Sequence, residues 1–115
     1  MAHLGPGFIV LYRWTLHPGT EDSFIRAWSH ISELLLKEWG SLGSRLHRGS
    51  DGVWYGYAQW PTSKVRERAH SGLPVDIQSA DQMDAAVAEA LPEIVLESVA
   101  DYLVSPLPLT RSSVN

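Results

Sequence analysis

The segment at residues 53–60, VWYGYAQW, constrains the fold most strongly, because apolar or aromatic side chains occur at both of its alternating positions. Successive side chains of a strand point to opposite faces. One face carries Trp54, Gly56, Ala58 and Trp60, and the other carries Val53, Tyr55, Tyr57 and Gln59. A strand that is apolar on both faces is covered on both. We therefore expect a central strand with other structure packed above and below it.

Two further strands are expected beside this segment. Residues 42–48 precede it, and the connecting residues 49–52, GSDG, are typical of a tight hairpin turn. Residues 8–15, FIVLYRWT, are again apolar at both alternating positions. In this first strand Tyr12 and Trp14 share a face, which we assign to the side that the helices cover.

Helical periodicity follows the first strand and the hairpin. Residues 21–39 repeat apolar side chains at helical spacing, with Thr20 as the expected N-cap and Gly40 as the expected stop. Residues 63–69, SKVRERA, predict a shorter and highly charged helix. Charges of this density usually lie on a solvated helix face, and we interpret this helix in that way.

The last third of the chain predicts a helix, a strand and a tail. The pattern at residues 79–82, SADQ, resembles a capping box, and an apolar stripe continues to Leu91, where Pro92 is expected to end the helix. Residues 96–104, LESVADYLV, predict the last strand. Residues 105–115 contain two prolines and are expected to form an extended tail that is either disordered or lies across a partner subunit.

The expected order of elements is β-α-β-β-α-β, the ferredoxin-like pattern of an α+β fold. It gives a four-stranded antiparallel sheet with helices on one face only, as a single domain over residues 1–104. The other face would carry Ile9, Leu11, Val53, Tyr55 and Tyr57. Leaving such side chains in water costs about 1.5–3 kcal/mol each. We therefore expect a homodimer whose two sheets pack face to face.

Composition excludes several classes of function. The chain of 115 residues has a formal net charge of -4, which argues against nucleic-acid binding, and it has no cysteine for disulfides or thiol chemistry. No apolar run is long enough for a membrane span, and no secretory signal is visible, so a cytoplasmic protein is expected. Five tryptophans are many for this length. Burial in an oligomer or a ligand pocket would explain them.

The sequence resembles the antibiotic biosynthesis monooxygenase family of the dimeric α+β barrel superfamily. The resemblance spans residues 8–104 and is carried by FIVLYRWTLHPGTEDSFIRAW, GSLGSRLHR and WYGYAQWPTSKVRERA. It implies a homodimer in which each subunit holds a pocket between its sheet and its helices. Characterised members oxidise aromatic polyketides with O2 and without a cofactor, whereas others degrade haem. The resemblance therefore implies a small aromatic substrate and no cofactor.

One position of the sequence matches a functional residue of the family, and several others do not. Trp60 matches the tryptophan that ends the family's third strand. The oxygenases have an asparagine where this chain has Gly56. The asparagine and histidine of the haem degraders fall at Tyr12 and near Ser79, so haem degradation is not expected.

Oxidation of this kind needs an apolar pocket and hydrogen-bond donors for the substrate oxyanion, and Trp N–H and Tyr O–H groups supply such donors. The catalytic candidates are Trp60 and Tyr12 as donors and His47 as a base. The ligand-binding candidates are Trp14, Trp28, Gly56 and His70. No two histidines stand at a metal-ligand spacing with a carboxylate, so no metal site is expected. A buried Arg13 would need an acidic partner, for which Asp101 and Glu97 are the candidates.

Two other interpretations stay open at this point. The first is a non-oxidative ligand binder, isomerase or lyase on the same scaffold, because Gly56 would enlarge the pocket and leave it without a polar group. The second is a purely structural or interaction domain, which predicts no cavity beside Trp60.

Overall fold

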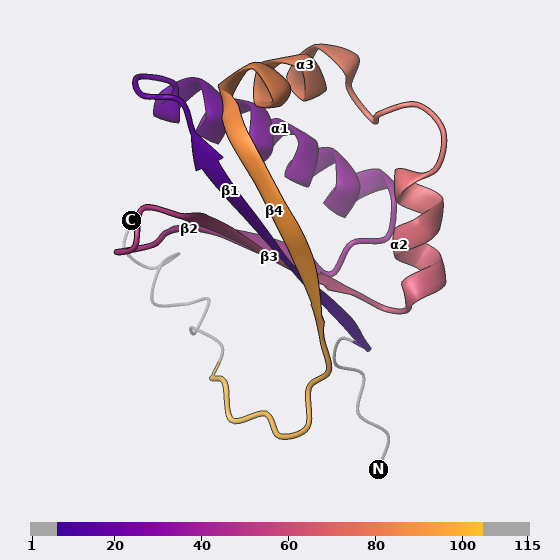
Figure 1. The fold of residues 1–115 in the computed structure, drawn as a ribbon. Helices are drawn as coiled ribbons and strands as arrows, with labels where there is room; N and C mark the ends of the chain where they lie inside the picture. Colours follow the sequence, from indigo (N-terminus) through magenta and orange to yellow (C-terminus); the bar gives the residue numbers. More distant parts are fainter. Residues whose placement is uncertain (1–6, 105–115) are drawn as a thin grey trace, which may run out of the picture.

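The computed structural model describes residues 7–104, so the expected tail at 105–115 lies outside the described residues. The elements follow in the order β1 (Phe8–Leu16), α1 (Glu21–Glu38), β2 (Gly43–Arg48), β3 (Trp54–Trp60), α2 (Ser63–His70), α3 (Ile77–Ala86) and β4 (Val87–Leu96). The strands form one antiparallel sheet in the order β2-β3-β1-β4. Figure 1 shows the helices gathered on one side of this sheet. This arrangement confirms the expected ferredoxin-like α+β fold.

The strand β3 lies inside the sheet, between β2 and β1, as its apolar composition predicted. Along it, burial alternates between fully buried and half-buried residues. The fully buried set is the one that faces the helices: Trp54, Gly56, Ala58 and Trp60. The side chains on the other face, which carries no helix, are only half-buried in one chain.

Two buried clusters join the sheet to the helices. One consists of Val10, Ala58, Trp60 and Ala69, and the other of Phe24, Trp54 and Ala86. In the second cluster the ring of Phe24 meets the rings of Trp14 and Trp54 edge-on, with centroids 5.2 and 5.9 Å apart. Edge-on packing is a favoured geometry for aromatic pairs. The tryptophans of β1 and β3 thereby fix the position of α1 over the sheet.

The helix α1 begins after Thr20 and ends near Gly40, as expected, but Thr20 does not cap it with its side chain. Its hydroxyl instead donates to the carbonyl of His17 at 2.7 Å, which closes the turn between β1 and α1. Gly40 has a φ of +84°, the left-handed conformation that glycine adopts readily just beyond a helix. Among the described residues, no helix is long and apolar enough to cross a membrane.

The predictions for the last third of the chain were wrong in their boundaries. The N-cap of α3 is Asp76, whose carboxylate accepts from the N–H of Ser79 at 2.9 Å, so the helix starts before the expected capping box at 79–82. The strand β4 begins at Val87, inside the expected helix, and ends at Leu96, where the strand was expected to begin. Pairing with β1 outweighs the helical propensity of the alanine-rich segment. Residues 97–104 form no helix or strand.

Pro92 lies within β4 because this strand is at the edge of the sheet and bulges there. Leu11 pairs with Ile94, whereas Arg13 pairs with Leu91, so two residues of β4 stand opposite Tyr12 alone. Edge strands and bulges are the places where a sheet tolerates proline. The guanidinium of Arg13 donates to the carbonyl of Pro92 at 2.7 and 3.2 Å, which corrects the expected pairing with Asp101 or Glu97.

Candidate functional site

A cavity of about 330 Å³ lies between the sheet and the helix layer. Its walls include Tyr12, Trp14, Trp28, Ile31, Leu35, Gly56, Ala58, Trp60, Ala69, His70, Leu73 and Met83. These residues come from β1, α1, β3, α2, α3 and the connection between α2 and α3, and most of them are apolar or aromatic. A volume of this size suits a small organic molecule. A purely structural domain was expected to have no cavity beside Trp60, so this cavity argues against that interpretation.

Two hydrogen-bond donors in this wall have no partner. The hydroxyl of Tyr12 and the indole N–H of Trp60 are buried, and neither meets an acceptor among the described residues. A buried donor without a partner costs about 1–3 kcal/mol. Groups left in this state usually serve a ligand or a bound water. A ligand with an acceptor oxygen that reached both groups would remove the cost.

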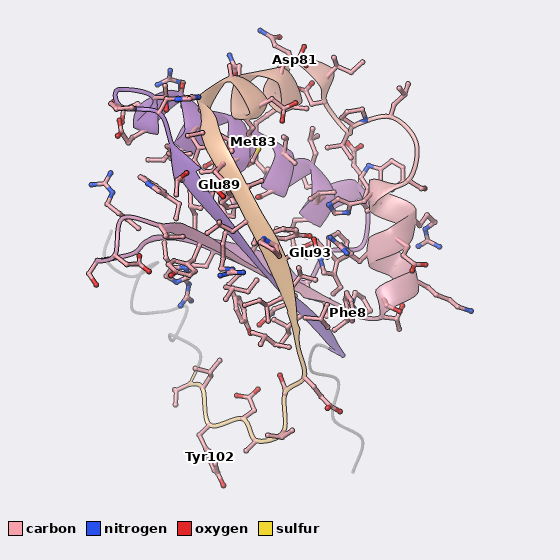
Figure 2. The ribbon with its side chains drawn as sticks, in the orientation of Figure 1. Phe8, Asp81, Met83, Glu89, Glu93 and Tyr102 are labelled. Atoms are coloured by element: carbon pink, nitrogen blue, oxygen red, sulfur yellow. The ribbon has the colours of Figure 1, made fainter. Side chains whose placement is uncertain are left out.

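Two charged residues, Arg66 and Glu93, lie close to Tyr12. The guanidinium of Arg66 lies 5.6 Å from the centre of the Tyr12 ring and donates to the carboxylate of Glu93 at 2.7 Å. This ion pair joins α2 to the bulge of β4, where Figure 2 labels Glu93. Burial raises the pKa of Tyr12 above its ordinary value, and the neighbouring Arg66 opposes the rise. The phenol therefore keeps its proton at neutral pH and acts as a donor.

Trp14 fills the space above Gly56. A Cβ atom at position 56 would lie 2.9 and 3.0 Å from two ring carbons of Trp14, and 3.4 Å from the indole nitrogen of Trp28. The ring of Trp14 also stacks on Tyr12, with centroids 5.9 Å apart. The expectation that Gly56 enlarges the pocket was therefore incomplete, because the missing side chain is replaced by a tryptophan ring.

Substituting Gly56 with alanine is expected to lower the free energy of unfolding by about 1–3 kcal/mol, the usual cost of overpacking a core. The new methyl group would push the Trp14 ring out of its place. Urea denaturation of Gly56→Ala, Trp14→Phe and the double variant measures this effect. The smaller ring should relieve the clash, so the double variant should be more stable than the sum of the two single changes predicts. Strictly additive effects would contradict the packing described here.

The structure brings together six of the seven candidate residues and separates one from them. Tyr12, Trp14, Trp28, Gly56, Trp60 and His70 all line the cavity. His47 does not line it: its side chain is exposed on β2, and its residue pairs with Tyr55, which points to the face without helices. The role of His47 as a base inside this cavity therefore has no geometric support.

Sequence reasoning missed the pair Arg66 and Glu93. The charged helix was interpreted as a solvated face, yet the Nε of Arg66 is buried. Helical spacing from Ala69 and Val65, the apolar positions of α2, indicates which charged residues turn toward the sheet. It does not reveal Glu93, because the bulge that places this residue beside Arg66 depends on the pairing of β4 with β1.

Comparison with solved structures confirms the fold. A candidate antibiotic biosynthesis monooxygenase from Caulobacter crescentus is 16% identical with a TM-score of 0.70, over 85% of this chain and 94% of that one. The cofactor-independent oxygenase SnoaB from Streptomyces nogalater is 15% identical with a TM-score of 0.70, over 84% and 97%. A Pseudomonas aeruginosa protein is 18% identical with a TM-score of 0.66, over 86% and 100%.

At these identities the likeness concerns the fold, which this chain shares with proteins of the predicted family. No protein-family profile and no curated protein sequence matches the chain.

Proposed function

We propose that this protein belongs to the antibiotic biosynthesis monooxygenase family and oxidises an aromatic or quinol-like small molecule with O2, without a cofactor. The observation that carries the proposal is the pair of unpartnered buried donors, Tyr12 and Trp60, in the wall of a mostly apolar cavity. The shared fold with SnoaB, described as a cofactor-independent oxygenase, supports it.

The proposed oxidation by O2 requires little from the protein beyond this cavity and its two donors. A phenol or anthrone that has lost a proton is electron-rich enough to pass one electron to O2, and the resulting radical pair recombines within the cavity. Tyr12 and Trp60 would donate hydrogen bonds to the substrate oxygen and so stabilise its negative charge. The aromatic walls would keep water from the radical pair.

We also propose that two copies pair through the sheet face that carries no helix. On this face Ile94 stands opposite Leu11 in the register, and Ile94 keeps 39% of its surface exposed in one chain. Leu96 stands opposite Ile9 in the same way. An apolar sheet face of this kind is expected to be covered, and a second copy is the partner with a matching face.

A second candidate function is non-oxidative: a ligand binder, isomerase or lyase with the same cavity. The observation that favours it is the Trp14 ring above Gly56: where the oxygenases have an asparagine, this chain has a tryptophan ring and no side-chain amide. Tight binding of an aromatic compound that is recovered unchanged would favour this function over oxidation.

Oxygen uptake with anthrone as substrate, in the absence of added metal or flavin, tests the proposal. Tyr12→Phe and Trp60→Phe should each lower kcat by about 10²- to 10³-fold, the usual cost of removing one donor to an oxyanion. Tyr102→Phe is the matched control, because Tyr102 is 92% exposed and should keep full activity. Absence of uptake by folded protein across anthrone and quinol substrates would contradict the oxidative function.

A further inference from the structure

We propose that His70 is the proton acceptor of the cavity, so that its substrate is a weak acid, either a phenol or an anthrone-like carbon acid. The proposal rests on the proposed function and assigns the deprotonation step to this residue. The O–H or C–H bond of the substrate breaks, the proton passes to Nε2 of His70, and the electron pair stays on the substrate. The resulting oxyanion then accepts hydrogen bonds from Tyr12 and Trp60.

The fold places this acceptor beside one of the two donors. His70 is the last residue of α2, directly after Ala69, which is buried in the core cluster with Trp60. Its imidazole meets the indole of Trp60 edge-on, with ring centroids 5.8 Å apart, and both residues line the cavity. A substrate oxygen bound by Trp60 would therefore lie in the same part of the cavity as the imidazole.

The backbone of α2 fixes the tautomer of this imidazole. Nδ1 of His70 lies 3.1 Å from the carbonyl oxygen of Arg66, one helical turn earlier. A carbonyl oxygen only accepts hydrogen bonds, so Nδ1 carries the proton and Nε2 holds the free lone pair. Within residues 7–104, Nε2 makes no hydrogen bond or ion pair. The nitrogen that can take a proton is thus the one that the protein leaves unused.

Burial, more than the neighbouring charges, keeps His70 neutral. Burial against the cavity wall is the main cause that lowers the pKa of His70 below its ordinary value, and the guanidinium of Arg66 acts in the same direction. The carboxylate of Glu93 on β4 and the carbonyl of Arg66 oppose the shift. The phenol of Tyr12, which also lines the cavity, is uncharged at neutral pH. The imidazole is therefore unprotonated near pH 7 and free to accept a proton.

A coloured phenol tests this assignment without a known substrate. Para-nitrophenol is yellow as an anion and nearly colourless as a neutral phenol, so its absorbance reports where its proton is. At a pH just below the probe's own pKa, wild-type protein should turn bound probe yellow, because the imidazolium of His70 and the donors of Tyr12 and Trp60 together stabilise the bound anion. His70→Gln keeps a polar side chain that cannot take a proton, so the ratio of anion to phenol should fall about tenfold or more. His47→Gln, an exposed histidine outside the cavity, is the matched control and should leave the colour unchanged.

Binding is followed separately by the quenching of tryptophan fluorescence, and circular dichroism confirms that each variant is folded. Probe that binds without turning yellow, or that turns equally yellow with His70→Gln, would overturn the role of His70 and leave the cavity's ligand-binding function intact. Probe that does not bind to wild-type protein would count against the proposed function itself, and against His70 with it. With anthrone, His70→Gln should lower kcat by roughly 10²- to 10⁴-fold.

Discussion

Replacing Trp60 with alanine is expected to lower the free energy of unfolding by about 3–5 kcal/mol, which is a large part of the stability of a domain of this size. Trp60 is 1% exposed and is the largest of the fully buried side chains among the described residues. It packs with Val10, Ala58 and Ala69, so its removal would leave a void that joins the cavity. Urea denaturation followed by circular dichroism measures the loss.

Two further variants separate the contribution of Trp60 to packing from its contribution to catalysis. Trp60→Phe keeps a buried aromatic ring but removes the indole N–H together with the five-membered ring, so it should cost less stability than Trp60→Ala and still lose the hydrogen bond to the substrate. Trp39→Ala deletes the same kind of side chain at the C-cap of α1, where it is 36% exposed, and should change stability much less than Trp60→Ala does. Equal losses for Trp60→Ala and Trp39→Ala would contradict the central place of Trp60 in the core.

Much of the sheet could be predicted because the residue pattern of each strand indicates which of its faces are buried. Side chains of β3 alternate between the two faces. Assigning one tryptophan to the helix side therefore assigns every other side chain of this strand to a face. The same alternation placed Tyr12 and Trp14 on the helix side of β1, and the structure confirms that both line the cavity. Local periodicity was sufficient here because neighbouring strands cover both edges of β3 and β1.

The same reasoning failed at residues 79–96 because local propensity and tertiary pairing disagree there. Alanine and glutamate favour a helix, and Met83 and Ala86 continue a helical stripe, yet Val87 pairs with Leu16 and begins the strand. Proline was taken as the end of a helix, although an edge strand with a bulge also accepts it. Only knowledge of the partner strand distinguishes the two cases.

The candidate site was predicted as far as it depends on the faces of strands. Contacts that depend on how a helix end meets the sheet were not accessible, which is why His70 was predicted only as a ligand-binding candidate and Arg66 as part of a solvated helix face. His47 failed for a simpler reason, since its register partner Tyr55 belongs to the face without helices.

That face carries the second large prediction, because its apolar residues are mostly only half-buried in a single chain; Ile9, expected to be exposed there, is the exception and is buried. Ile94→Asp should convert a dimeric protein into monomers, as Ile94 lies opposite Leu11 on the helix-free face. In a two-fold interface the substitution occurs twice. At about 1–3 kcal/mol for each buried polar group without a partner, association should weaken by roughly 10²- to 10⁴-fold.

Sedimentation velocity over a range of concentrations measures this change in association. Ile77→Asp is the matched control, because Ile77 is 55% exposed on α3, in the helix layer, and its substitution should leave the dimer intact. A dimer that survives Ile94→Asp would place the interface elsewhere. A wild-type protein that sediments as a stable monomer would contradict the dimer altogether, since the half-buried apolar side chains of this face would then stay partly in water.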